Sequence, residues 1–168
     1  MTSEGRVWKF GDDINTDLII PGRYLDNYDS SHLAKHAMEG VSKEFASAAR
    51  QGDIIVAGRN FGCGSSREQA VVALRSAGVS MIAARSFARI FYRNAVNLGL
   101  MVVVSEDAAE AFHGGETATV DLSGGFIVSA ESDRKVSFES MPGRLRVILD
   151  CGGLVPYLKT KRSSGKSV

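Results

Sequence analysis

The middle of the chain alternates short apolar runs with longer amphipathic segments. The apolar runs lie at 53–57, 80–84 and 100–104, and the segments between them, 66–77 and 87–98, carry apolar side chains at helical spacing. This alternation is typical of parallel strands that are joined by right-handed helical crossovers. The sequence therefore predicts an α/β fold with a parallel core sheet.

Three further apolar runs follow the parallel region, at 117–122, 126–131 and 135–139. Their side chains alternate in character, and short turns rich in serine, glycine and aspartate separate them. Tight turns of this kind connect antiparallel neighbours. We therefore expect additional antiparallel strands beside the parallel core.

The remaining segments predict shorter elements. A strand is expected at 6–10, and residues 18–20 should be buried where this strand leads into the fold. Serine and proline start signals and glycine stop signals then predict helices at 30–39, 42–50, 107–113 and 142–151.

The length of the chain favours a single domain. Its 168 residues are 44% hydrophobic, which is sufficient for one core. We expect one domain over residues 1–159. The serine-rich and basic segment 160–168 is predicted to be a mobile tail.

Charge and hydropathy exclude two classes of partner. The 20 basic and 19 acidic residues nearly cancel, so no global field favours a nucleic acid. The apolar runs are too short to cross a bilayer, and the first residues lack the pattern of a secretory signal. We therefore expect a cytoplasmic protein that binds neither nucleic acid nor membrane.

The ligands for a metal site are scarce in this sequence. Cys63 and Cys151 have no neighbouring cysteine, and the three histidines do not form a cluster by themselves. Iron–sulfur and zinc sites need several such ligands at close spacing. We expect this chain to bind no metal or cofactor by itself.

A loop of unusual composition follows the first predicted core strand. Residues 58–68 read Gly-Arg-Asn-Phe-Gly-Cys-Gly-Ser-Ser-Arg-Glu. In open α/β sheets, ligands bind beyond the carboxyl ends of the strands, and a helix start there offers free N–H groups to an anion. The hydroxyls of Ser65 and Ser66 and the guanidinium of Arg67 suit a carboxylate. The spacing matches neither a P-loop nor a dinucleotide-binding loop, so we expect a small anion.

The same residues also allow a purely structural interpretation. The pattern from Ser65 to Glu68 is that of a capping box, in which the serine would cap the helix that follows. The two interpretations are compatible, because a capping serine can still face a ligand at that helix end.

Two motifs carry a resemblance to a known family. The segment from Gly62 to Glu68, followed by Ser-Phe-Ala-Arg-Ile at 86–90, resembles the swivelling-domain signature of aconitases and isopropylmalate isomerases. Segments 12–21 and 152–158 resemble the beginning and the end of the free-standing small subunits of this family. The resemblance implies an aconitase-type swivelling β/β/α domain and a hydro-lyase activity. It also implies a large subunit that carries a [4Fe-4S] cluster and completes the enzyme, which is active only as the pair.

The resemblance assigns roles to individual residues of the loop. Ser65 resembles the catalytic serine that acts as an alkoxide base, and Ser66 and Arg67 resemble ligands of the substrate carboxylate. Asn60 aligns with an asparagine of the aconitase loop and is expected to bind substrate. Cys63 stands where aconitases carry glutamate, and we interpret it as a thiol that packs within the loop.

Two charged residues near these motifs are left outside the catalytic set. Asp17 is either a turn or capping carboxylate or a polar group of the active site. Arg89, in the Ser-Phe-Ala-Arg motif, is expected to form a structural ion pair.

The resemblance also points to a specificity loop, which consists of Tyr24, Leu25, Asp26 and Asn27. In related small subunits this loop lies near the variable substituent of the substrate, and an arginine there accompanies the extra carboxylate of homoaconitase substrates. Asp26 would repel such a carboxylate. The favoured hydroxy-dicarboxylates are therefore 2-isopropylmalate and 3-isopropylmalate, whose interconversion belongs to leucine biosynthesis. The alternatives are 2,3-dimethylmalate or homoaconitate as substrate, or a non-catalytic module that binds carboxylates.

Overall fold

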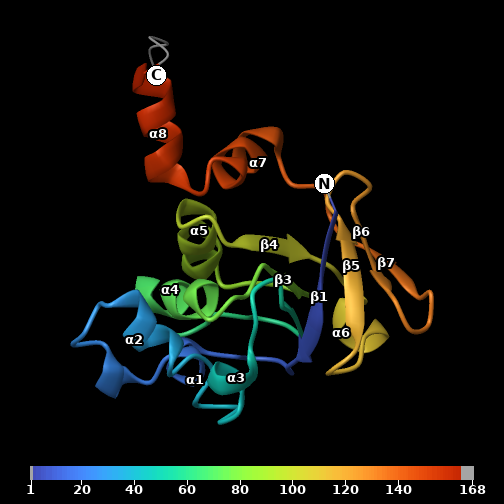
Figure 1. The fold of residues 1–168 in the computed structure, drawn as a ribbon, viewed down its shortest axis with the longest axis horizontal. Coiled ribbons are helices and arrows are strands. Elements are labelled where there is room, and N and C mark those ends of the chain that lie inside the picture. The colour runs from blue at the N-terminus through green and yellow to red at the C-terminus, as the bar shows by residue number, and fades with distance from the viewer. Residues whose placement is uncertain (1, 164–168) are drawn as a thin grey trace.

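Seven strands form one mixed sheet in the computed structural model, which describes residues 2–163 (Figure 1). Their order across the sheet is β4-β3-β2-β1-β5-β6-β7. The strands are β1 (Thr2–Lys9), β2 (Ile54–Ala57), β3 (Met81–Ala84), β4 (Met101–Val104), β5 (Thr117–Asp121), β6 (Phe126–Ser129) and β7 (Lys135–Ser137). The helices are α1 (Thr16–Ile19), the 3-10 helix η1 (Gly22–Tyr24), α2 (Ser30–Ala34), α3 (Phe45–Ala48), α4 (Glu68–Ser76), α5 (Arg89–Asn97), α6 (Ala108–Ala111), α7 (Gly143–Asp150) and α8 (Leu154–Ser163).

The three predicted core strands, β2, β3 and β4, are parallel, and β1 joins them as a fourth parallel strand. β1 pairs with β2, β2 with β3, and β3 with β4, all in parallel. Every residue of β2 and β3 is buried, which is typical of parallel strands that are covered on both faces. Helices α4 and α5 are the crossovers, as the alternating pattern predicts. The predicted α/β fold with a parallel core is confirmed.

The predicted antiparallel strands are also confirmed. β5 pairs with β1, and β6 and β7 follow in antiparallel order. The two ends of the sheet curl toward each other, because the Glu139 N–H donates to the Val104 carbonyl at 2.8 Å. The Ser105 hydroxyl also donates to the Ser137 carbonyl at 2.8 Å. These bonds protect both edge strands at their ends.

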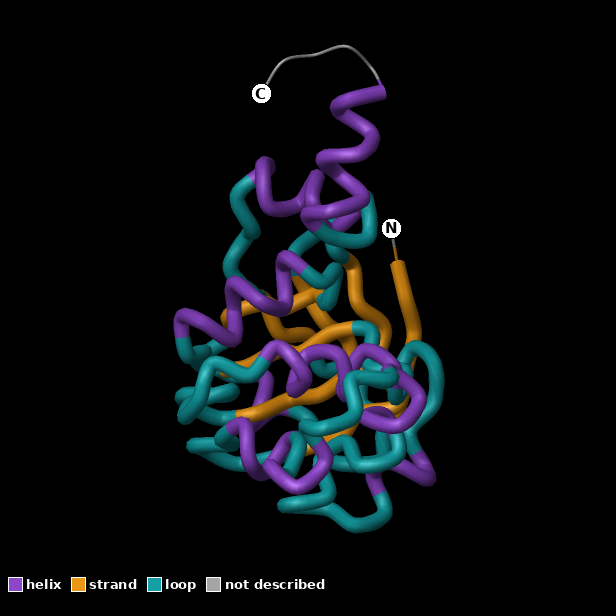
Figure 2. The backbone as a smooth tube through the Cα atoms, turned by 90° about the vertical axis from the view of Figure 1, so that its left-hand side faces the viewer, coloured by secondary structure: helices purple, strands orange, loops and turns teal. Residues whose placement is uncertain are grey.

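Alternate side chains of the parallel strands enter two separate cores. Ile55 and Ile82 belong to a cluster that includes residues of α4 and α5. Ile54 and Val56 point to the opposite face and share a second cluster with Phe112, after α6, and with residues of the antiparallel strands. In Figure 2, helices and loops cover the side of the sheet that faces the viewer.

Three predicted elements have different bounds in the structure. β1 begins at Thr2, well before the predicted strand at 6–10, because its first half pairs with β5. The helices predicted at 30–39 and 42–50 are reduced to α2 and α3. Met38 ends the helical path, because its φ is +59° and its N–H donates to the Ile19 carbonyl at 2.7 Å.

A helix that the sequence did not predict closes the described chain. Gly152 and Gly153 have φ values of +85° and +126°, and they turn the chain from α7 into α8 (Figure 1). α8 continues across the predicted boundary between 159 and 160 and ends at Ser163, so the tail begins as a helix. Residues 164–168 of the predicted tail lie outside the described residues, and the division into domain and tail stays a prediction.

The close approach of β1 to the turn before β2 leads to a first prediction. A Cβ atom added at Gly5 would lie 1.9 Å from the carbonyl oxygen of Gly52, which is backbone and cannot move aside freely. We expect Gly5→Ala to lower the free energy of unfolding by about 1–3 kcal/mol, the usual cost of overpacking. Gly11→Ala is the matched control, because an added Cβ there meets no atom within 4 Å. Urea denaturation measures both, and equal midpoints would contradict the prediction.

Candidate active site

Three loops at the carboxyl ends of β1, β2 and β3 are joined by backbone hydrogen bonds. We call residues 11–17 the N-terminal loop and residues 58–67 the site loop. The site loop lies between its two neighbours, because the Gly62 N–H donates to the Ile14 carbonyl at 2.7 Å and the Phe61 N–H donates to the Ser86 carbonyl at 3.0 Å. The loop that was predicted to carry the site is therefore held on both sides at the edge where α/β folds bind ligands.

Two glycines permit this close packing. A Cβ atom at Gly58 would lie 1.9 Å from a carboxylate oxygen of Asp12, and a Cβ atom at Gly62 would lie 2.1 Å from the ring of Phe91. Gly62 also has a φ of +78°, which side chains other than glycine rarely adopt. The glycine pattern of the site loop thus serves its path between the N-terminal loop and α5.

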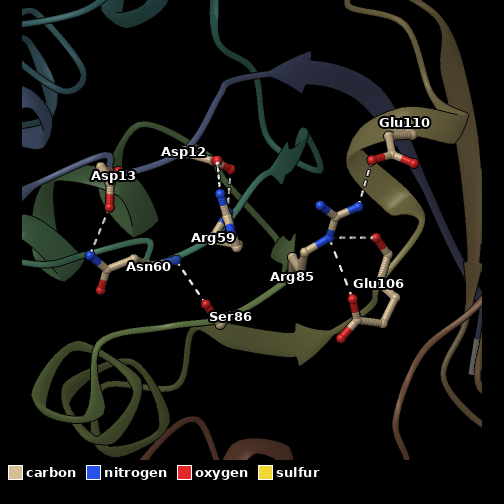
Figure 3. Close-up of polar contacts among 8 residues, drawn as sticks. All are labelled: Asp12, Asp13, Arg59, Asn60, Arg85, Ser86, Glu106 and Glu110. Carbon is tan, nitrogen blue, oxygen red and sulfur yellow. Dashed lines mark hydrogen bonds and ion pairs between the residues drawn. The ribbon is translucent and has the colours of Figure 1, made fainter.

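Side-chain contacts reinforce the backbone hydrogen bonds (Figure 3). The Arg59 N–H donates to Asp12 at 2.7 Å, and the Arg59 guanidinium approaches the second oxygen at 3.2 Å. The Arg59 backbone N–H, followed by its guanidinium, holds the pKa of Asp12 below its ordinary value. Nearby, Arg85 contacts Glu110 at 2.5 Å and Glu106 at 3.4 Å. These charges are paired with one another.

Asn60 joins the same network through both its backbone and its side chain. Its amide Nδ2 donates to Asp13 at 2.8 Å, and its backbone N–H donates to the Ser86 hydroxyl at 2.8 Å (Figure 3). Its φ is +60°, a conformation that asparagine tolerates better than most residues. Asn60 therefore links the three loops, and its predicted contact with a substrate stays a prediction.

Ser65 is exposed and lies over a buried threonine. Its hydroxyl oxygen is 3.1 Å from that of Thr16, a residue that is only 1% exposed. The capping box predicted from Ser65 to Glu68 is wrong. Helix α4 begins at Glu68, its N-cap residue is Arg67, and no side chain caps it. The Ser65 side chain instead makes a tertiary contact with α1.

Arg67 forms an ion pair with Asp17 at 2.5 Å. The Arg67 side chain is 24% exposed and the Asp17 side chain 63%, so the guanidinium is the more enclosed partner. Asp17 does not cap α1, because that role belongs to Asn15, whose side chain accepts from the Leu18 N–H at 2.9 Å. Asp17 is therefore not the cap of α1, and its part in the active site stays a prediction.

The 3-10 helix η1, which leads into the predicted specificity loop, begins beside this ion pair. An ideal Cβ atom at Gly22 would lie 3.8 Å from both Arg67 and Asp17. Tyr24 is held in place, because its ring stacks on His36 with centroids 3.6 Å apart. Its hydroxyl also donates to Glu39, at 2.8 Å.

The rest of the specificity loop differs in exposure along its length. Leu25 is half-buried against the cluster that includes residues of α4 and α5, whereas Asp26 and Asn27 are exposed. Within residues 2–163, the Asp26 carboxylate takes part in no ion pair. Asn27 accepts a hydrogen bond from the Asp29 N–H at 2.9 Å, so this part of the loop is ordered by a local turn.

Ser66 and Arg89 are exposed, whereas Thr16 is buried. Ser66 is exposed next to Ser65. Arg89 is exposed and has no ion pair among residues 2–163, so the expected structural pair is wrong. Thr16 is the residue that sequence reasoning missed. The only signal for it was its position in the polar segment from Asp12 to Asp17.

Cys63 is half-buried within the site loop. Its carbonyl accepts the Thr16 N–H at 2.9 Å, and burial raises the pKa of its thiol, with a further contribution from Asp13. In residues 2–163, no three histidine, cysteine or acidic side chains are grouped so that they could hold a metal ion. None of the helices in this range is long and apolar enough to span a membrane.

Comparisons with known proteins place this geometry in context. Residues 11–108 match the family described as the aconitase C-terminal domain. The chain is 51% identical over 155 residues to 3-isopropylmalate dehydratase small subunit 1 of Methanopyrus kandleri, which covers 92% of this chain and 91% of that protein. It is 54% identical over 157 residues to the methanogen homoaconitase small subunit of Methanothermobacter thermautotrophicus, with 93% and 91% covered.

A solved structure agrees with the fold described above. The crystal structure of 3-isopropylmalate dehydratase from Methanocaldococcus jannaschii superimposes with a TM-score of 0.94 at 45% sequence identity. The match covers 98% of this chain and 98% of that chain. The expected aconitase-type swivelling fold is confirmed.

The environment of Cys63 leads to a second prediction. Thiolates react with iodoacetamide and thiols do not, so a raised pKa should slow the alkylation of Cys63 at neutral pH. In the Cys151→Ser variant, which leaves one thiol, we expect the midpoint of the rate against pH to lie above that of the same variant unfolded in urea. A midpoint at or below that of the unfolded chain would contradict the burial that the structure gives to Cys63.

Proposed function

Because the chain belongs to the family of aconitase C-terminal domains, we propose that it is the small subunit of a hydro-lyase that interconverts 2-isopropylmalate and 3-isopropylmalate. The reaction is a dehydration followed by a rehydration, and it serves leucine biosynthesis in the cytoplasm. The observation that carries the proposal is the exposed Ser65 hydroxyl, which contacts Thr16, while Asp17, the next residue in the chain, forms the ion pair with Arg67.

The chemistry assigned to Ser65 is proton transfer. As an alkoxide, it removes a proton from a substrate carbon, the electron pair forms a carbon–carbon double bond, and the hydroxyl leaves the adjacent carbon. Rehydration reverses these steps at the other carbon. A serine hydroxyl is a very weak acid, so its ionised form needs hydrogen-bond donors and positive charge nearby.

The neighbouring residues are assigned to the substrate carboxylate. Arg67 has five N–H donors, of which the contact with Asp17 leaves several available. Ser66 is exposed beside it, and the N-terminal end of α4 adds its dipole. Asn60 is assigned a supporting role, because its side chain is engaged with Asp13 in the free subunit.

The site needs a second protein to close it. Ser65 and Ser66 are exposed, so in this chain alone their hydroxyls face solvent. The residues of this chain do not fit an iron–sulfur cluster, because Cys63 lies in the site loop and Cys151 follows α7. We assign a [4Fe-4S] cluster to a large subunit, where it supplies Lewis-acid chemistry for the hydroxyl that leaves.

The choice of substrate rests on Asp26. Its exposed carboxylate has no cationic partner among residues 2–163, and it follows the anchored Tyr24 on the same loop. A negative charge there repels a distal carboxylate and leaves room for an alkyl group. Homoaconitate is the second candidate, because a relative of 54% identity is named as a homoaconitase subunit. We retain 2,3-dimethylmalate as a related possibility of the same reaction type.

A third prediction tests the role of Ser65. In a complex reconstituted with its large subunit, we expect Ser65→Ala to lower kcat by about 1,000-fold or more, with a smaller change in KM, because the base acts in the chemical step. The isolated variant should stay folded, because the side chain is exposed and water can replace it as the partner of the Thr16 hydroxyl.

Two outcomes would contradict this proposal. Nearly full turnover in Ser65→Ala would favour a non-catalytic module that binds carboxylates. Turnover by the purified small subunit alone would contradict the assignment of half the site to a partner. The Ser123→Ala variant, which lies in the turn between β5 and β6, is the matched serine control and should keep wild-type rates.

A fourth prediction concerns specificity. We expect Asp26→Arg to shift the ratio of kcat/KM toward homoaconitate over 3-isopropylmalate by about 10-fold or more, because the new cation attracts the extra carboxylate. The Asp26→Asn variant separates the loss of repulsion from the gain of attraction, and it should give a smaller shift. A wild-type enzyme that already prefers homoaconitate would contradict the argument from Asp26.

A further inference from the structure

We infer that Thr16 is a positioning residue for the base, because its buried hydroxyl donates a hydrogen bond to the Ser65 hydroxyl oxygen. The inference rests on the function proposed above and adds a residue to it. The two oxygen atoms lie 3.1 Å apart, and they belong to residues from the separate loops that follow β1 and β2.

Two backbone hydrogen bonds hold Thr16 in place. Its N–H donates to the Cys63 carbonyl at 2.9 Å, and its own carbonyl accepts the Ile20 N–H at 2.9 Å. The residue is 1% exposed. Its hydroxyl therefore has a fixed position, which is the requirement for a group that orients another one.

The burial of Thr16 decides which hydroxyl is the donor. Within residues 2–163, the one hydrogen-bond partner of the Thr16 hydroxyl is Ser65. A buried hydroxyl that donated to nothing would lose the bonds it makes to water in the unfolded chain. Ser65 is exposed, so its own O–H can point to a ligand or to solvent. Thr16 therefore donates, and Ser65 accepts.

Gly64 makes the approach of the two hydroxyls sterically permissible. Its φ is +92°, and an added Cβ atom would lie 3.3 Å from the Thr16 hydroxyl oxygen. A side chain at this position would strain the backbone and crowd the hydroxyl. The glycine immediately before Ser65 thus contributes to the contact between Ser65 and Thr16.

The hydrogen bond has a direct consequence for the base. When Ser65 is an alkoxide, the hydrogen bond from Thr16 becomes charge-assisted, and such a bond is shorter and stronger than one between neutral groups. Because Thr16 is already in place, little reorganisation is needed when the charge forms. The Thr16 proton stays on Thr16, and the proton removed from the substrate carbon goes to Ser65.

Other charged and titratable groups also lie near Ser65. Arg67 and Asp17 form the adjacent ion pair, Cys63 precedes Ser65 in the site loop, and Glu68 starts α4. Tyr28 faces Glu68 from the specificity loop side. None of these groups is changed by a substitution at Thr16, so a shift that follows such a substitution reports the hydroxyl.

A fifth prediction tests the inference in the complex with the large subunit. We expect Thr16→Val, which keeps the shape and removes the hydroxyl, to lower kcat by about 10- to 100-fold with little change in KM. The acid limb of the pH profile of kcat should move to higher pH, because an alkoxide without its donor binds a proton more tightly. Thr16→Ser keeps the donor. It should restore kcat to within about threefold of the wild type and return the acid limb to its wild-type position.

Controls separate this role from a merely structural one. Thr119→Val on β5 makes the same exchange away from the site and should leave the rates unchanged. If Thr16→Val fails to fold or to bind the large subunit, Thr16→Ala replaces it in the same comparison, since it removes the hydroxyl and adds no bulk.

The outcomes are distinguishable from a failure of the proposed function. A hydroxyl-free variant at Thr16 with unchanged kcat and an unmoved acid limb overturns the inference. A slow Thr16→Ser variant, or a slow Thr16→Val variant with an unmoved limb, also overturns it, because shape alone would then explain the loss. If Ser65→Ala is inactive and Thr16→Val is normal, only the inference about Thr16 is overturned. If Ser65→Ala is fully active, the proposed function and the inference are both overturned.

Discussion

The hydrogen bonds between the N-terminal loop and the site loop are the constraint on which the site depends. They continue the parallel pairing of β1 and β2 beyond the ends of both strands, with a last parallel bridge between Asn15 and Cys63. Each such bond contributes on the order of 0.5–1.5 kcal/mol, and together they fix two loops that ordinary connections would leave mobile. Ser65 and Thr16 meet only because these loops run side by side. The position of Ser65, the proposed base, therefore follows from the sheet itself.

The ion pair of Arg67 with Asp17 changes how the electrostatics of the site should be understood. From sequence alone, the guanidinium of Arg67 is a source of positive charge near the hydroxyls of the site loop. In the structure, the guanidinium lies 2.5 Å from a carboxylate, which offsets much of its field. Arg67 is thus oriented in advance for a planar carboxylate but supplies little net charge. In the proposed mechanism, the hydrogen bond from Thr16 and the large subunit provide most of the remaining stabilisation of the alkoxide.

The sequence predicts the features that depend on local periodicity and fails where distant contacts decide. The strands and the two crossover helices follow from alternating apolar residues, and the site loop follows from its glycines and its place after β2. The helix predicted through 30–39 ends at Ala34, and Met38 bonds to the distant Ile19 instead of continuing it. The capping box fails because Ser65 contacts Thr16, a residue far away in the chain. No local pattern contains that partner, so only the folded chain could reveal it.

The arrangement of the proposed specificity loop is consistent with one scaffold that serves different substituted malates. The contacts that hold the loop are made by Tyr24, which stacks on His36 and bonds to Glu39. Asp26 lies beyond this anchor and is exposed. An exchange at an exposed position costs little folding free energy, so this residue can vary without disturbing the anchor or Ser65. Relatives of 51% and 54% identity that are named for different substrates fit the proposed division, in which the fold maintains the reaction and a few exposed side chains select the substrate.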